Sequence, residues 1–246
     1  MKKLTIFFVA ALMLGACAKK NDSGEREYET YKITLTDSVQ IISNEMDSCN
    51  EVATTLKDKI GSLLPEFRAV NNSREVEGYM IFQGWENRYP LQSTGVVARL
   101  SESRQLELVA ALKGGEFDRI RVNAPSVSAE TAVVPYDQAL NYRRDGLNTV
   151  LFTGPEADKV ANLIADNELN PITVTFLNGG KQTGTWRMDH DNAKMITMTY
   201  LLYSANKEHK ELEVRLLKLG EKRKLLRQHR ELMNLMRDPR RERGHR

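Results

Sequence analysis

VQIISNEMDSCNEVATTLKDKIGSL, residues 39–63, carries the most regular hydrophobic pattern in the chain. The residues between its apolar positions are mostly polar, so the pattern predicts a helix with a narrow apolar seam of the coiled-coil kind. We place this helix within residues 30–64, with Asp37 and Gln40 capping its start and Pro65 ending it. The apolar or small positions alternate at spacings of three and four: Val39, Ile42, Met46, Cys49, Ala53, Leu56, Ile60 and Leu63.

A second heptad pattern occupies the C-terminal part of the chain. Its more apolar seam position recurs every seven residues, at Ala205, Leu212, Leu219, Leu226 and Met233. The other seam position is mixed and includes His209, Arg223 and Arg230. These features predict a helix over residues 204–238, followed by a basic tail over 239–246. Because a narrow seam does not bury itself, we expect the two helices to pair as an antiparallel coiled coil, within one chain or between two.

Residues 65–203, between the helices, have the alternation and turn residues typical of β-strands. One helix is expected after Thr153-Gly154-Pro155-Glu156, which offers a capping box and an early proline. We therefore predict an α+β fold, in which a sandwich-like or barrel-like β-rich domain with one helix is flanked by the two long helices. The predicted strands are Val76–Phe82, Gly95–Leu100, Leu106–Leu112, Phe117–Val122, Leu147–Phe152, Pro171–Leu177, Thr183–Met188 and Lys194–Tyr203.

The N-terminus has the pattern of an export signal. Lys2 and Lys3 precede the apolar run Leu4–Leu14, which is too short to span a bilayer as a mature helix but is typical of a signal-peptide core. The run ends in Leu14-Gly15-Ala16-Cys17, an apolar residue and two small residues before a cysteine. This motif resembles the lipobox of bacterial lipoproteins.

The resemblance implies that residues 1–16 are removed as a signal peptide and that Cys17 carries lipid in a membrane. Residues 17–29 are polar and lack periodicity, which favours a flexible tether. An aspartate after the cysteine can retain such proteins in the inner membrane, and Ala18 stands there instead. We therefore expect an outer-membrane location in a Gram-negative source, with the periplasmic or surface face left open. The mature part also resembles uncharacterised envelope lipoproteins of Bacteroidota.

Composition limits the partners of the chain. Its 246 residues are 41% hydrophobic and carry a net charge of +3. From Ala205 to Arg246, 14 Lys/Arg against 7 Asp/Glu give +7, which leaves −4 on the rest. An exported chain of this kind is not expected to bind nucleic acid. The arginines at 237, 240, 241, 243 and 246 form either a solvated end or a contact for anionic lipid or another acidic polymer.

Motifs for chemistry are weak. Asp189-His190-Asp191-Asn192 lacks the glycine and glutamate of a calcium loop and favours a turn, and the chain's four histidines have no metal-ligand spacing. No metal and no cofactor are therefore expected. Cys49, on the helical seam, is expected to be buried, with an intermolecular bridge as the alternative. The candidate ligand-contact aromatics are Trp85, Tyr89, Tyr136 and Trp186, for which core packing is the commoner role.

These observations favour a membrane-anchored, non-enzymatic binding or assembly module. Membrane lipid would be held through Cys17, and an envelope protein or a second copy of the chain through the helices. The ligand is open, and catalysis is uncertain. The alternative is an envelope hydrolase acting on glycan or peptide, because a site assembled from distant residues leaves no local motif.

Overall fold

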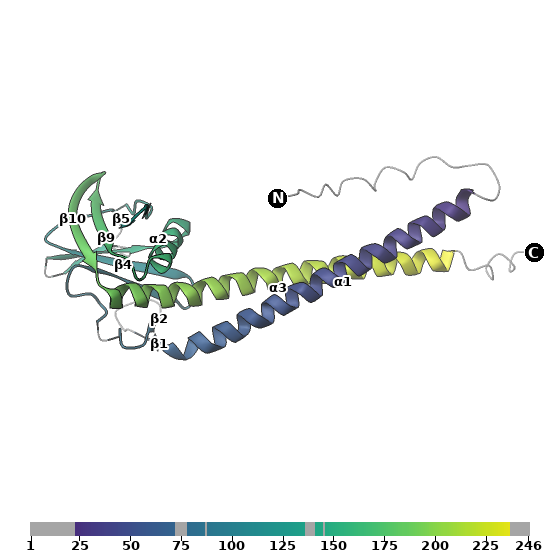
Figure 1. The fold of residues 1–246 in the computed structure, drawn as a ribbon, viewed down its shortest axis with the longest axis horizontal. Coiled ribbons are helices and arrows are strands. Elements are labelled where there is room, and N and C mark those ends of the chain that lie inside the picture. The colour runs from purple at the N-terminus through teal and green to yellow at the C-terminus, as the bar shows by residue number, and fades with distance from the viewer. Residues whose placement is uncertain (1–22, 72–77, 87, 136–140, 145, 237–246) are drawn as a thin grey trace, which may run out of the picture. The chain divides into compact units, whose positions relative to one another are not determined.

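The computed structural model describes residues 23–71, 78–86, 88–135, 141–144 and 146–236 (Figure 1). These residues form three α-helices, one short 3-10 helix (Leu64–Glu66) and ten β-strands. They divide into two compact units, one made of residues 23–47 with 218–236 and the other of residues 48–217. Each unit is described by itself below.

The strands, all within residues 48–217, form two antiparallel sheets. The first has the order β1-β2-β3-β4-β8-β7 and the second the order β10-β9-β5-β6. The first sheet consists of β1 (Phe67–Val70), β2 (Tyr79–Phe82), β3 (Gly95–Ser101), β4 (Leu106–Lys113), β7 (Asn141–Arg144) and β8 (Leu147–Phe152). The second consists of β5 (Arg119–Ala124), β6 (Val127–Glu130), β9 (Ile172–Asn178) and β10 (Lys181–Met188).

The two sheets share one hydrophobic core. Phe117 joins them, because its ring centroid lies 6.3 Å from that of Phe152 on β8 and 4.9 Å from that of Phe176 on β9. Gly184 of β10 lies where the sheets approach closely, since a Cβ there would lie 2.8 Å from Cδ1 of Leu112 on β4. The predicted α+β fold, with a β-rich domain and two long flanking helices, is confirmed.

Most predicted strands are present with small shifts at their ends, and the hairpin turn at Gly179-Gly180 has the positive φ values that glycine allows. Three strands of four residues each were not predicted, namely β1, β6 and β7. Their burial pattern explains this for β6, where no side chain is buried and no apolar alternation marks the strand.

The helix α2 (Pro155–Asp166) is confirmed, but its predicted capping box is wrong. Gly154 is the N-cap residue, with φ of 86°, and no side chain caps the helix. Proline in the first turn and the acidic residues Glu156 and Asp158 favour the helix start instead, through preset φ and the helix dipole. Five apolar side chains of α2 are buried: Ala157, Val160, Ala161, Leu163 and Ile164.

The helix α3 (His190–Met236) begins at His190 rather than at residue 204, so the predicted strand Lys194–Tyr203 is wrong. The predicted turn before it is an N-cap, in which Asp189 Oδ1 accepts a hydrogen bond from the backbone N–H of Asn192 at 2.8 Å. Tertiary burial overrides the β propensity of this run, because four side chains at helical spacing lie in the core. They are Met195, Ile196, Thr199 and Leu202, each with 0% of its surface exposed.

The helix α1 (Ser23–Leu63) also begins earlier than predicted. Residues 23–29, assigned to the flexible tether, are helical, and Asp37 lies inside the helix rather than at its cap. The predicted boundaries at residues 30 and 203/204 are therefore wrong, because both helices extend further toward the N-terminus than their clearest heptads. The signal peptide, Cys17 and residues 18–22 lie outside the described residues, as do Tyr136 and the basic tail.

In the unit of residues 23–47 and 218–236, α1 and α3 contact each other in antiparallel order. Tyr28 Oη donates a hydrogen bond to Asn234 Oδ1 at 3.2 Å, and Tyr31 Oη lies 3.1 Å from His229 Nε2. Further along, Met46 Cε lies 4.0 Å from where a Cβ of Gly220 would stand. In Figure 1, the chain runs in opposite directions along the paired parts of α1 and α3. The antiparallel pairing expected from the heptads is thus present within one chain.

Burial follows the predicted seams. On α1, Leu35, Val39 and Ile42 are buried and mark the α1 seam in this unit. On α3 the seam residues are only half-buried: Leu219, Arg223, Leu226, Arg230 and Met233. In the unit of residues 48–217, Cys49 and Leu56 are buried, and Ile60 and Leu63 pack against the core of the sheets.

Candidate functional site

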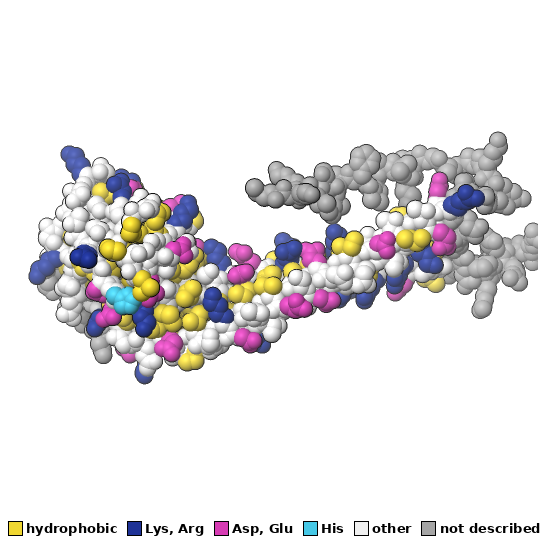
Figure 2. All heavy atoms as spheres, viewed as in Figure 1, with side chains coloured by type: hydrophobic (Ala, Val, Ile, Leu, Met, Phe, Trp, Pro, Cys, Tyr) yellow, Lys and Arg dark blue, Asp and Glu magenta, His cyan; other side chains and the backbone are white. Residues whose placement is uncertain are grey.

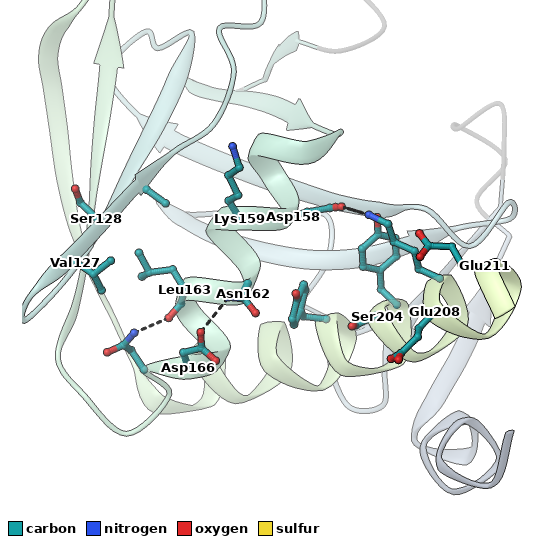
Figure 3. Close-up of a pocket in the computed structure, with 15 residues that line it drawn as sticks. Val127, Ser128, Asp158, Lys159, Asn162, Leu163, Asp166, Ser204, Glu208 and Glu211 are labelled. Atoms are coloured by element: carbon teal, nitrogen blue, oxygen red, sulfur yellow. Dashed lines mark hydrogen bonds and ion pairs between the residues drawn. The ribbon is translucent and has the colours of Figure 1, made fainter. Parts of the chain in front are cut away.

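A groove of about 690 Å³ lies between β6, α2 and α3, within residues 48–217 (Figure 3). Its side chains come from β6, from the face of α2 that begins at Asp158, and from α3 between Tyr200 and Glu211. A volume of this size is within the range of small-molecule sites. The described lining residues are Val127, Ser128, Ala129, Asp158, Lys159, Asn162, Leu163, Asp166, Asn167, Tyr200, Tyr203, Ser204, Lys207, Glu208 and Glu211.

Three side chains that line this groove form a hydrogen-bonded cluster. Tyr203 Oη donates to Asp158 Oδ2 at 2.6 Å, and Lys207 Nζ donates to the same oxygen at 3.0 Å. Lys207 Nζ also lies 3.3 Å from Tyr203 Oη. Tyr203 and Lys207 are four residues apart on α3, which places both side chains on one helix face toward Asp158 in the first turn of α2.

The cluster shifts the proton affinity of its members. Burial raises the pKa of Tyr203 above its usual 10.0, and the hydrogen bond to Asp158 raises it further. Burial, followed by the charge of Asp158, also raises the pKa of Tyr200. The hydrogen bond to Asp158 raises the pKa of Lys207 above its usual value. At neutral pH Tyr200 and Tyr203 therefore keep their phenol protons, and Lys207 keeps its ammonium charge.

Carboxylates outnumber ammonium groups along the groove. Asp158, Asp166, Glu208 and Glu211 face Lys159 and Lys207 in the lining, which gives a formal charge of −2. Asn162 Nδ2 donates to Asp166 Oδ2 at 2.9 Å and so fixes this carboxylate on the surface of α2. Together with the tyrosine rings, these groups suit a ligand that carries hydroxyl or ammonium groups rather than an anion.

A smaller cavity of about 320 Å³ adjoins the same cluster. It is lined from β4, from the segment between β3 and β4 and from the start of α2, and Asp158 and Tyr203 line it as well. Ser101 Oγ and Ser103 Oγ lie 2.9 Å apart on its wall. The Asp158–Tyr203 hydrogen bond is therefore shared by both cavities.

The predicted ligand-contact aromatics do not form this site. Trp85 and Tyr89 are only 8% and 6% exposed and belong to the core. Tyr89 Oη accepts a hydrogen bond from Arg99 Nη1 at 2.8 Å, and the Arg99 guanidinium lies 4.5 Å from the Tyr79 ring centroid. Trp186 on β10 is half-buried and packs near Gly95. Trp85, Tyr89 and Trp186 therefore have packing contacts, the role given above as the commoner one.

The other candidate residues have structural positions. Cys49 is buried with a free thiol, in agreement with the packing role predicted for it. Asp189 and Asn192 form the cap of α3. Across the described ranges, no three His, Cys, Asp or Glu side chains converge in a way that would hold a metal ion. None of the helices in those ranges has the length and hydropathy needed to span a membrane.

Sequence reasoning missed Tyr200 and Tyr203 because their segment was assigned to a strand, and this separated them from Lys207, which was assigned to the following helix. On a strand, Tyr200 and Tyr203 would point to opposite faces, whereas on a helix the three residues share one face. The signal that identifies them is the spacing 200, 203, 204, 207, 208 and 211, which is a polar helical stripe. No sequence pattern indicated that α2 and β6 lie opposite this stripe.

No protein-family model matches the sequence, and no curated protein is significantly similar to it. One similar solved structure is described as the crystal structure of a novel protein of unknown function from Burkholderia pseudomallei K96243 at 1.90 Å resolution. The two chains are 10% identical, and the match covers 62% of this chain and 94% of the other, with a TM-score of 0.23. At that TM-score the likeness carries no argument about fold or function.

Proposed function

We propose that this chain is an envelope lipoprotein, anchored in a membrane through Cys17, whose β-rich unit is a non-enzymatic binding module. The groove between β6, α2 and α3 is the proposed ligand-binding site. The lipobox Leu14-Gly15-Ala16-Cys17 supports the anchor, and Ala18 favours the outer membrane of a Gram-negative cell. The observation that carries the binding proposal is the Asp158–Tyr203–Lys207 cluster.

The cluster supports binding because its polar groups are pre-positioned. A carboxylate oxygen that accepts from both Tyr203 Oη and Lys207 Nζ is held in one place, and so are its two donors. A ligand that binds here contacts side chains that are already ordered. Little conformational entropy is then lost on association, which favours binding. The half-buried ring of Tyr200 adds an apolar surface beside these side chains.

The same cluster favours binding over hydrolysis. A general base or nucleophile works best when its pKa lies near the working pH. The pKa of Tyr203 is instead raised by burial, and Lys207 is held as an ammonium group by Asp158. These two groups act as hydrogen-bond donors and keep their protons at neutral pH.

The lining indicates the ligand class. Carboxylates in excess select against anions, while tyrosine rings and side-chain amides suit the faces and hydroxyls of sugar rings. We therefore propose a hydroxyl-rich ligand with ammonium groups, and a glycan whose amino sugars carry free amines has this chemistry.

The anchor is tested by replacing Cys17. Cells that express the Cys17→Ser variant and are fed labelled palmitate should yield an unlabelled protein that no longer sediments with membranes. The unchanged chain, expressed in parallel, should be labelled. Labelling that persists in the variant would exclude Cys17 as the lipid site.

The groove is tested by calorimetric titration with soluble fragments of a de-N-acetylated amino-sugar glycan, whose amines are ammonium groups at mildly acidic pH. Asp158→Asn removes the shared acceptor charge and should weaken binding about tenfold, since hydrogen bonds to charged groups contribute about 1.5–3 kcal/mol. Asp191→Asn is the matched control, because Asp191 also lies in the first turn of a helix but outside the groove.

Three outcomes are informative. Binding that is lost in Asp158→Asn and kept in Asp191→Asn supports the groove. Equal binding by both variants places the ligand elsewhere. Turnover of the fragments that depends on Asp158 would instead establish a hydrolase.

A further inference from the structure

We infer that the outer face of the last part of α3 lies on the surface of the anionic phospholipid membrane that holds the anchor. This face, the α3 lipid face, is made of Lys218, Lys222, Lys224, Leu225, Leu232 and Leu235. The inference rests on the membrane anchoring proposed above and names a second contact with the same membrane.

The first observation is an exposed apolar stripe. Leu225, Leu232 and Leu235 are 65%, 54% and 57% exposed, although they belong to a helix with an apolar seam of its own. Spacings of seven and three place them on one side of α3. The seam residues Leu226 and Met233 follow directly in sequence, lie about 100° further round the helix and are half-buried. Such large exposed apolar groups in a row mark an interaction surface.

The second observation is charge. Residues 218–236 carry six Lys/Arg against two Asp/Glu, a net +4, while residues 23–47 of the paired helix carry two against six, a net −4. Lys218, Lys222 and Lys224 are exposed beside the leucines, together with Glu221 and Glu231. Figure 2 shows hydrophobic and charged side chains interspersed on the visible face of the helices. Leucines flanked by lysines are the residues of helices that lie in the membrane interface.

The third observation is position. Tyr28 contacts Asn234, so the start of α1 and the end of α3 lie together in one unit. Cys17 is six residues before Ser23, and six residues span at most about 20 Å. A lipid on Cys17 therefore holds the membrane surface within about 20 Å of the helix ends. Leu232 and Leu235 are neighbours of Asn234 in sequence and meet that surface first.

These three observations favour a membrane, rather than another protein, as the partner of the α3 lipid face. A soluble partner or a second copy of the chain accounts for an apolar stripe but not for its nearness to the lipid-bearing cysteine. Anionic headgroups account for the positive sign of 218–236, and the acidic α1 then faces away from the membrane. Each lysine near such a surface strengthens binding about fivefold.

The test uses residues 18–246, which include every described residue and lack the lipid, so its result does not depend on lipidation of Cys17. The protein is sedimented with vesicles of phosphatidylcholine containing about one third phosphatidylglycerol, and with phosphatidylcholine alone. We expect binding to the anionic vesicles, weak binding to the neutral vesicles, and loss of most binding at about 1 M salt, where the Debye length falls to about 3 Å.

Two matched variants locate the contact. Leu225→Asp and Ile41→Asp make the same chemical change, and both side chains are 65% exposed within the same unit, on α3 and α1 respectively. Leu225→Asp should weaken binding to anionic vesicles about tenfold or more, and Ile41→Asp should leave it within about twofold. Lys222→Gln should weaken it about fivefold.

Other results overturn the inference. Vesicle binding that is absent, or that is reduced equally by Leu225→Asp and Ile41→Asp, excludes the α3 lipid face as a membrane contact. Light scattering that shows a dimer dissociated by Leu225→Asp, without vesicle binding, assigns the stripe to a second copy of the chain. Loss of labelling in Cys17→Ser combined with absent vesicle binding leaves the anchor intact and removes only this second contact.

Discussion

The stretch of α3 from His190 to Ala205 and the stretch from 218 to 236 share one helical backbone but are packed in different ways. In the first, Met195, Ile196 and Leu202 have 0% of their surface exposed, and they belong to the core of the two sheets. In the second, Leu226 and the other seam residues are only half-buried, and the partner is the single helix α1.

The difference shows that apolar side chains of one helix can contribute different amounts to the free energy of unfolding. A side chain in the core contacts atoms on all sides, so its removal leaves a cavity. A side chain in a two-helix seam keeps one flank near water and loses less when it is shortened. We expect the first stretch to unfold only with the sheets, whereas the second opens at a lower cost.

The largest predicted effect compares one leucine from each stretch. Leu202→Ala should lower the free energy of unfolding by about 2–5 kcal/mol, because Leu202 is fully buried. Leu226→Ala should cost only about 1 kcal/mol, since Leu226 is half-buried in the seam. Urea unfolding followed by circular dichroism measures both. Equal losses would show that the seam is packed as tightly as the core, so that the two stretches of α3 would not differ in stability.

The second prediction tests the seam from the side of α1. Leu56 is 8% exposed and Lys57 beside it is exposed, so Leu56→Asp places an unpaired charge in the seam while Lys57→Asp does not. We expect a loss of about 3 kcal/mol for the first variant and within about 0.5 kcal/mol for the second. If thermal unfolding shows the same shift for both, the seam is not buried at this position.

The third prediction concerns the cluster beside α2. Burial and the hydrogen bond to Asp158 raise the pKa of Tyr203 in the folded state. The protonated phenol therefore stabilises the fold below the unfolded pKa of about 10. This stability is lost as the pH rises through the folded pKa of Tyr203. Lys207, whose folded pKa is also raised, acts with the same sign. Asp158→Asn should therefore shift tyrosine ionisation, followed by ultraviolet absorbance, to lower pH. An unshifted curve in Asp158→Asn, or the same shift in Asp191→Asn, would contradict the cluster geometry.

The smallest predicted effect lies at the helix ends. Tyr31→Phe removes the hydroxyl that lies 3.1 Å from His229 Nε2 while keeping the ring in edge contact with the imidazole at 5.8 Å. Both groups are near water, so the variant should lose no more than about 0.5 kcal/mol. His229→Ala removes both contacts and should lose about 1 kcal/mol. Hydrogen exchange of the amides near Tyr31 should measure the loss of local stability in each variant. A larger loss in Tyr31→Phe than in His229→Ala would contradict this order.

Local patterns predicted the elements whose side chains repeat at one period. The eight apolar or small positions from Val39 to Leu63 predicted the second half of α1 because helix geometry alone explains them, and the short apolar run Leu106–Leu112, followed by the turn residues Lys113-Gly114-Gly115, predicted β4. The run Lys194–Tyr203 was misassigned because β-branched residues favour strands locally. Its burial in the core that the sheets share decided for a helix, and burial depends on segments far away in the sequence.

The candidate site was not predictable for the same reason. Its walls come from Val127 on β6, Asp158 on α2 and Lys207 on α3, which no spacing in the sequence relates. Each is an ordinary residue by itself, and only the tertiary arrangement places Tyr203 and Lys207 on one carboxylate oxygen. The resemblance of Leu14-Gly15-Ala16-Cys17 to a lipobox could be seen in the sequence because a linear motif does not depend on tertiary structure.

The pairing of Tyr28 with Asn234 joins positions 206 residues apart, and this separation has a consequence for biogenesis. A ribosome adds about 5–20 residues per second, so α1 exists for about 10–40 s before the end of α3 is made. During that interval Leu35, Val39 and Ile42 have no partner from their own chain. A chaperone that binds exposed apolar seams can act in that interval, and residues 218–236 of α3 displace it when they cover the seam.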